Sequence, residues 1–151
     1  MVLRLKCNGA KVWYRSHGFQ SSVVRRQTLG GKLGIGYKQL DVYQRSYQLA
    51  KEIHRLTQKF PGTEKYELGS QLRRSAVSIV LNIAEGYGRK ESEKEFQHFL
   101  RNALGSCNEV RVLLDFCKDL NYLNETIYHD LEANYEIVSR QLYRLRESCI
   151  S

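Results

Sequence analysis

Residues 96–117 read FQHFLRNALGSCNEVRVLLDFC, and this stretch decides the fold. Its small and apolar residues recur at alternating intervals of four and three: Phe96, Leu100, Ala103, Cys107, Val110, Leu114 and Cys117. That spacing is the heptad seam of a coiled coil or helical bundle, in which one side of a helix faces the core. A long amphipathic helix is therefore predicted, and it requires other helices to cover its apolar side.

Two further helices are predicted before this one. From residue 40 to residue 60 apolar residues recur at helical spacing, and the helix should stop at Pro61-Gly62. Thr63 can then cap a second helix, with Glu64 and Glu67 in its first turn. The second apolar stripe contains Leu68, Leu72, Ala76, Ile79 and Ile83, and that helix should end near residues 86–88.

Start and stop signals complete the pattern. Ser92 followed by Glu95 is a capping box that predicts the start of the third helix. Asn121 or Asn124 should mark its break, and a fourth helix follows with apolar residues from Ile127 to Leu145. Four long helices with short connections predict an all-α fold, an antiparallel up-down-up-down four-helix bundle, over residues 37–151.

Charge divides the chain unevenly. Residues 1–36 contain seven Lys or Arg and no acid, whereas residues 37–151 contain 17 Lys or Arg against 16 Asp or Glu. The first segment has no 7–15-residue apolar run, so we do not expect a secretory signal. We expect it to be a basic extension, disordered or non-native; an organellar transit peptide and an arm that grips nucleic acid are the alternatives. The Arg25-Arg26 pair is not followed by the apolar region of a twin-arginine signal.

The sequence lacks the motifs that are typical of several classes of functional site. No GxSxG or phosphate-binding glycine loop occurs, so we expect no enzyme and no cofactor. Glu95-x-x-His98 occurs only once, whereas a di-metal centre needs that motif on two helices, so we expect no metal. Cys107 and Cys117 fall on an apolar stripe, which indicates free thiols in a reducing compartment, and no apolar stretch is long enough for a membrane span. We expect a cytoplasmic protein.

Some small and polar residues lie inside the predicted helices. Gly69 and Gly105 each cost about 1 kcal/mol relative to alanine. They either allow close approach of two helices or are tolerated at the surface. Asn82 should be a satisfied buried amide that fixes packing, and Glu85 should form an intrahelical ion pair with Arg89.

Basic residues are the candidate binding groups. Arg73 and Arg74 are adjacent in mid-helix with no acid three or four residues earlier, which favours a phosphate-binding surface. Arg89 and Lys90 at the end of that helix, with Arg101 on the next, complete the candidate nucleic-acid-binding site. The dipole at a helix C-terminus explains Arg89 and Lys90 equally well. Tyrosines gather in the first two helices, at Tyr37, Tyr43, Tyr47, Tyr66 and Tyr87. They add further stacking or interface groups, although most should be residues at the rim of the core.

Six segments of the chain match one known pattern: residues 37–43 (YKQLDVY), 60–61 (FP), 71–79 (QLRRSAVSI), 82–89 (NIAEGYGR), 96–100 (FQHFL) and 103–106 (ALGS). Through them the chain, from residue 37 to about residue 147, resembles the bacterial four-helix-bundle family encoded within intervening sequences of 23S ribosomal RNA genes. That family is similar to the accessory variability proteins of diversity-generating retroelements. The resemblance implies a homo-oligomer, a pentameric ring, with basic surface for RNA or DNA.

Two function hypotheses follow. The first is a non-enzymatic protein that binds structured nucleic acid, RNA above all. The alternative is a structural module that docks a partner protein such as a reverse transcriptase.

Two features depart from the family pattern. Members usually read SIPSNIAEG, whereas this chain reads Ser78-Ile79-Val80-Leu81-Asn82. The missing proline removes a kink, so the second helix should be straighter, and Leu81 replaces a small polar residue. Residues 1–36 have no counterpart in the family.

Overall fold

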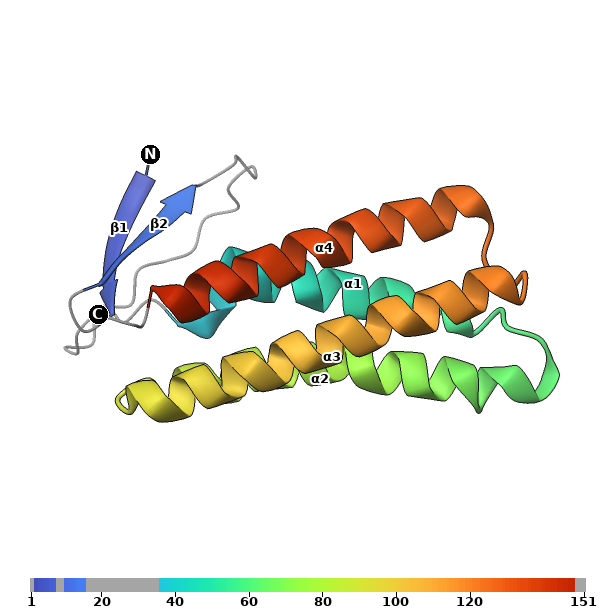
Figure 1. Ribbon diagram of the computed structural model, residues 1–151, viewed down its shortest axis with the longest axis horizontal. Helices are drawn as coiled ribbons and strands as arrows, with labels where there is room; N and C mark the ends of the chain where they lie inside the picture. Colours follow the sequence, from blue (N-terminus) through green and yellow to red (C-terminus); the bar gives the residue numbers. More distant parts are fainter. Residues whose placement is uncertain (1, 8–9, 16–35, 149–151) are drawn as a thin grey trace, which may run out of the picture.

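The computed structural model describes residues 2–7, 10–15 and 36–148. Four long helices pack side by side in the last of these ranges (Figure 1). They are α1 (Asp41–Thr57), α2 (Leu68–Gly88), α3 (Glu93–Asp119) and α4 (Glu125–Glu147), with short 3-10 turns at η1 (Tyr37–Gln39) and η2 (Gly62–Lys65). The predicted all-helical body of residues 37–148 is confirmed.

The core lies between the four helices. Every member of the heptad seam on α3 is buried, and Leu100, Cys107 and Leu114 are wholly inaccessible. Each helix contacts two others, and α1 and α4 make the loosest of these pairs. The α1–α2 and α3–α4 connections lie at one end of the bundle, and the α2–α3 connection lies at the other (Figure 1).

The prediction that Cys107 and Cys117 are free thiols on an apolar stripe is confirmed. Cys107 and Cys117 are free and buried, and the Cys107 thiol donates to the carbonyl oxygen of Tyr135 at 3.3 Å. Burial raises the pKa of Cys107 to about 11 and that of Cys117 to about 12. Both thiols are therefore protonated small apolar groups at neutral pH.

Helix ends follow the sequence signals with one exception. Ser92 caps α3 by accepting from the Glu95 N–H at 3.4 Å, and Asn124 caps α4 by accepting from the Ile127 N–H at 2.8 Å. The prediction that Thr63 caps the second helix is wrong. Thr63 lies within η2, its carbonyl accepts from Tyr66 and Glu67, and α2 begins at Leu68. A 3-10 turn thus occupies the place of a first α-helical turn.

Part of residues 1–36, for which we expected a disordered or non-native extension, forms strands where the structure describes it. Strands β1 (Val2–Cys7) and β2 (Ala10–Arg15) form an antiparallel hairpin in which Val2 pairs with Arg15 and Cys7 with Ala10. The sequence carried this signal, because Leu3 and Leu5 alternate with Arg4 and Lys6, and Asn-Gly at residues 8–9 is the dipeptide typical of a two-residue hairpin turn. Residues 16–35, with the Arg25-Arg26 pair, lie outside the described residues.

The glycine and polar residues inside the helices have different roles. A Cβ on Gly69 would lie 3.2 Å from the Glu64 carbonyl oxygen, whereas a Cβ on Gly105 would meet nothing within 4 Å. Gly69 therefore allows close packing, and Gly105 is a tolerated surface glycine. Asn82 is half-buried and donates to the Ser78 carbonyl oxygen at 2.8 Å, while the Ser78 hydroxyl reaches Ser106 on α3 at 2.8 Å. Asn82 is thus satisfied beside a polar bridge between α2 and α3.

Candidate nucleic-acid interface

Arg73 is committed to the fold. Its Nη1 donates to the Thr57 hydroxyl at 2.9 Å, and its Nη2 donates to the Lys65 carbonyl oxygen at 3.1 Å. The half-buried guanidinium therefore joins the end of α1 to η2 and the start of α2. This pairing accounts for a mid-helix arginine that the sequence left unexplained.

Arg74 and Arg101, unlike Arg73, are free of contacts that would tie them to the described part of the fold. Both side chains are exposed, and neither has a hydrogen bond, ion pair or ring contact within residues 36–148. Each therefore stands available to a ligand, Arg74 from α2 and Arg101 from α3.

Arg89 and Lys90 lie at the α2–α3 connection. Arg89 bonds to Glu85 at 3.1 Å, which confirms the intrahelical pair, and its guanidinium stands 5.3 Å from the centre of the Phe99 ring. Lys90 Nζ stands 4.1 Å from the centre of the Tyr87 ring. Both cations are thus placed on aromatic faces at the surface of this end of the bundle.

The five predicted site residues do not form one patch. Arg74 and Arg89 are separated by 15 residues of α2, which corresponds to about 22 Å along the helix axis. Arg73 lies with Arg74 near the α1–α2 end, whereas Arg89, Lys90 and Arg101 lie toward the α2–α3 end. The structure therefore groups three of the five.

Sequence reasoning missed further cations at that end. Lys94 is exposed seven residues before Arg101, so both occupy one side of α3, with exposed His98 between them. The half of the bundle nearer the α2–α3 connection (residues 37–47, 80–105 and 137–148) contains nine Lys or Arg against six Asp or Glu. The other half (residues 48–79 and 106–136) contains eight against ten.

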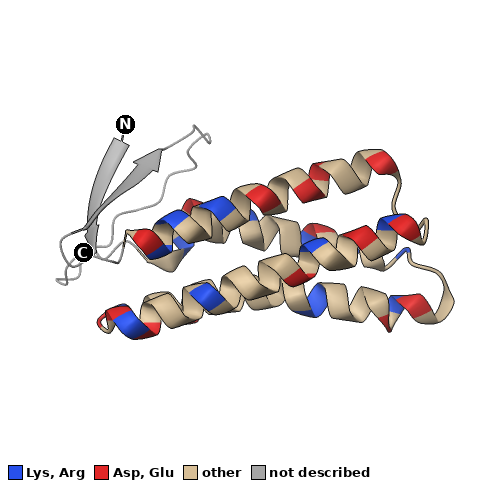
Figure 2. Cartoon of the chain, viewed as in Figure 1, with Lys and Arg blue, Asp and Glu red and all other residues tan. Residues whose placement is uncertain are grey.

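Helix α4 shows most clearly that basic and acidic residues gather in opposite halves of the bundle. Residues 125–136 contain four acids and no Lys or Arg, and residues 137–147 contain three Arg and one Glu. Figure 2 shows the acidic positions of α4 toward the α3–α4 connection and its arginines toward the opposite end. We use the name "basic end" for the cations that collect there: Lys38, Arg89, Lys90, Lys94, Arg101, Arg140, Arg144 and Arg146.

Four tyrosines line up beside the basic end. Tyr87 and Tyr37 are 6.4 Å apart between ring centres, Tyr37 and Tyr43 are 5.0 Å apart, and Tyr43 and Tyr47 are 6.1 Å apart with planes 18° from parallel. We call these four the tyrosine row. Tyr66 was predicted to cluster with them, but it lies near the opposite end, where η2 meets α2. The row links residues 37 and 87, and that long-range contact had no signal in the sequence.

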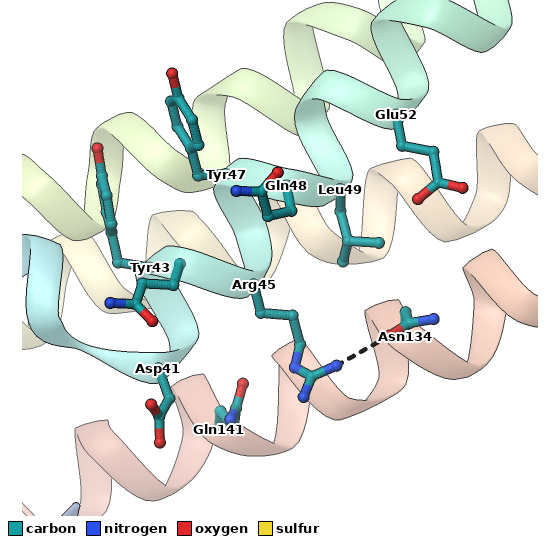
Figure 3. A pocket seen from close by; sticks show the side chains of 10 residues that line it. Asp41, Tyr43, Arg45, Tyr47, Gln48, Leu49, Glu52, Asn134 and Gln141 are labelled. Carbon is teal, nitrogen blue, oxygen red and sulfur yellow. Dashed lines mark hydrogen bonds between the residues drawn. The ribbon is translucent and has the colours of Figure 1, made fainter. Parts of the chain in front are cut away.

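A broad groove of about 890 Å³ runs over the outer side of α1 between the tyrosine row and α4. Arg45 crosses it and donates to Asn134 of α4 at 3.0 Å. Figure 3 shows Tyr43 and Tyr47 projecting from the opposite side of α1 to Arg45. The groove is lined mainly by polar side chains: Asp41, Gln44, Gln48, Glu52, Asn134 and Gln141.

A family model described as 23S rRNA-intervening sequence protein matches residues 38–144. The chain belongs to this family. A solved structure from Bacteroides thetaiotaomicron, described as a protein with unknown function from the S23 ribosomal protein family, superposes with a TM-score of 0.65. The two chains are 23% identical over 70% of this chain and 95% of that one, a likeness that shows the fold alone. No protein of curated function matches the sequence.

One departure from the family pattern lies on the surface of α2 in this 23S rRNA-intervening sequence protein. Leu81, at the position where the resemblance implies a small polar residue, is 61% exposed on the outer side of α2. Helix α2 continues without a break from Leu68 to Gly88 through the position of the missing proline.

The described residues of this family member contain neither a candidate metal site nor a candidate membrane span. Within them, no group of three or more His, Cys, Asp or Glu side chains could hold a metal ion. None of the described helices combines the length and the apolar character that a membrane span needs.

Proposed function

We propose that this family member is a non-enzymatic, self-associating bundle that binds nucleic acid, above all RNA, through the basic end. The observation that carries the proposal is the segregation of charge. A body with almost no net charge places nine cations against six acids in one half and leaves Lys94 and Arg101 exposed there. Contacts from such groups to phosphates supply affinity without reading the base sequence.

The same proposal includes the arrangement of the bundle and its assembly. Connections at alternate ends support an antiparallel up-down-up-down order (Figure 1). Large apolar side chains lie exposed in rows four residues apart, Val77 and Leu81 on α2 and Val112, Phe116 and Leu120 on or just after α3. Rows of this kind support contacts between copies. The pentameric ring implied by the family resemblance is the assembly we propose.

The second candidate function is docking of a partner protein such as a reverse transcriptase. The exposed apolar rows favour it, because they would suit a partner as well as another copy. Acids at Glu85, Glu91, Glu93 and Glu95 also reduce the positive potential near the α2–α3 connection. A cytoplasmic setting is proposed for either function.

The test compares two exposed arginines in the full chain. Arg101→Glu is the site variant, and Arg74→Glu is its matched control, because both are mid-helix arginines without a partner in residues 36–148. Binding to a labelled structured RNA is followed by fluorescence anisotropy across a range of salt concentrations. Every variant retains residues 1–36, so their seven cations contribute equally to all measurements.

We expect Arg101→Glu to weaken binding and to reduce the dependence of log affinity on log salt by about one phosphate contact. Arg74→Glu should have a much smaller effect. Equal affinities and equal salt slopes for the two variants would contradict an interface at the basic end. Docking of a partner protein would then be the favoured function.

A further inference from the structure

We propose that the tyrosine row is a stacking platform for unpaired bases, so that this protein binds single-stranded segments of nucleic acid in preference to duplex. This inference rests on the proposed nucleic-acid function and names the form of nucleic acid that is bound. It assigns a role to Tyr37, Tyr43, Tyr47 and Tyr87, none of which belonged to the basic site predicted from the sequence.

Ring geometry is the first support. Adjacent ring centres in the row are 5.0 to 6.4 Å apart, and the row passes from α2 through η1 onto α1. Tyr37 meets Tyr43 and Tyr87 edge to face, and Tyr43 and Tyr47 are the stacked pair. Tyr43 and Tyr47 stand nearly parallel on successive turns of α1 (Figure 3). Tyr47 is 47% exposed, whereas the other three tyrosines are half-buried, so the outer member of the row is the ring that a base can reach most readily. Accessible aromatic rings are the feature on which single-strand-binding proteins stack bases, and the stacked pair of Tyr43 and Tyr47 with its exposed outer ring supplies one.

Cations at both ends of the row are the second support. Lys90 Nζ lies 4.1 Å from the ring centre of Tyr87 at one end, and Lys51 Nζ lies 5.7 Å from the ring centre of Tyr47 at the other. Exposed Lys38 is next to Tyr37 in the chain. A single strand whose bases stack on the rings would bring its phosphates to these lysines, which complement the charge of that ligand.

The electrostatic state of the rings suits this ligand. Desolvation, with smaller contributions from Tyr37 and Tyr47, raises the pKa of Tyr43 above its ordinary value. A phenol is neutral at physiological pH even at its ordinary pKa, and the rise acts in the same direction, so the Tyr43 hydroxyl does not repel phosphate.

Gln44 and Gln48 lie in the groove beside the row. The Gln44 amide NH2 donates to the Lys38 carbonyl oxygen at 2.9 Å, and Gln48 Oε1 accepts from Lys51 at 3.1 Å. Within residues 36–148, Gln44 Oε1 and the Gln48 NH2 are therefore the groups left to bond to the edges of splayed bases.

Duplex nucleic acid cannot use these rings in the same way. Its bases already stack on one another inside the helix, so its recognition depends on shape and on backbone contacts. The basic end can hold the phosphates of either form, but only unpaired bases can gain from the tyrosine row. A preference for single strands is therefore the signature that separates the row from the basic end.

The experiment measures binding of the full chain to a labelled oligouridine and to a labelled duplex of the same length. The site variant is Tyr47→Ala, and the matched control is Tyr66→Ala, which removes a tyrosine that is also exposed and also has a lysine near its ring but lies outside the row. Tyr47→Phe tests whether the ring alone suffices. Circular dichroism melts establish that each variant is folded.

We expect Tyr47→Ala to weaken oligouridine binding at least about fivefold, since loss of one base–aromatic stack typically has this effect or more. Duplex binding should be unchanged, and Tyr47→Phe and Tyr66→Ala should bind oligouridine as the wild type does. Equal loss from Tyr47→Ala and Tyr66→Ala, or equal loss for single strand and duplex, would overturn the stacking role and leave the proposed function standing. A wild-type chain that binds neither RNA would overturn both.

Discussion

Gly86→Ala should destabilise the protein, although alanine is the better helix former. Gly86 is buried in α2, and a Cβ built there would lie 2.8 Å from the Cβ of Phe99 and 3.1 Å from Cδ2 of Phe96. The Phe99 Cβ is attached to the backbone of α3, so it cannot swing away as the end of a flexible side chain could. The two helices must therefore separate by several tenths of an ångström beside Gly86.

The expected magnitude is the difference between two opposing effects. Replacing glycine with alanine inside a helix contributes up to about 1 kcal/mol. Overpacking a well-filled site costs about 1–3 kcal/mol, and a contact this short with a backbone-attached atom favours the upper part of that range. We therefore expect a net loss of about 1–2 kcal/mol in the free energy of unfolding.

Gly105→Ala is the matched control and should change stability in the opposite direction. It makes the same substitution inside α3, where the new Cβ would meet nothing within 4 Å. A gain of about 0.5–1 kcal/mol is expected. Urea unfolding curves at one protein concentration measure both variants. If Gly86→Ala is as stable as Gly105→Ala, the close approach of α2 and α3 is not what requires glycine at residue 86.

Three further predictions follow from the described contacts. Arg73→Gln should lower the free energy of unfolding by about 1–3 kcal/mol in urea melts, because two hydrogen bonds from a charged, half-buried donor are lost, whereas Arg74→Gln should change it by less than about 0.5 kcal/mol. In a protein whose other two cysteines are serine, Cys107 and Cys117 should react with a thiol reagent only as fast as the protein unfolds, and rapid labelling of the native state would contradict their burial. Stability should fall as pH rises from 9 toward 11, because the unfolded thiols lose protons near their ordinary pKa of 9.0 while the folded thiols, with a raised pKa, retain theirs; pH-dependent thermal melts measure this.

The helices could be predicted because their signals are local. The heptad seam on α3 and the caps at Ser92 and Asn124 each depend on residues within a few positions of one another. The wrong prediction that Thr63 caps α2 also came from a local signal. Thr63, Glu64 and Glu67 satisfied a local rule for a helix start, but Arg73 bonds to the Lys65 carbonyl, a contact that the local pattern does not contain. Tertiary contact outweighed propensity there.

The candidate site was less predictable because it depends on which residues the fold brings together. Adjacent Arg73 and Arg74 were given one role, yet successive positions of a helix point about 100° apart, and only Arg73 turns toward Thr57. The tyrosine row required Tyr37 and Tyr87 to meet across 50 residues. Periodicity assigned tyrosines to the rim of the core, but it could not show that four of them form a continuous row.

The proposed surfaces are compatible because they occupy different sides of the bundle. Tyr87 follows Leu81 by six residues, which places it about 240° farther round α2, so the tyrosine row and the exposed apolar row of α2 face different ways. Copies joined through the apolar rows would therefore leave each tyrosine row open. An RNA that reaches two rows binds the second one at a high effective concentration, so an assembly can hold RNA firmly even if each row binds it weakly. Self-association would then be a source of affinity for a body that has almost no net charge.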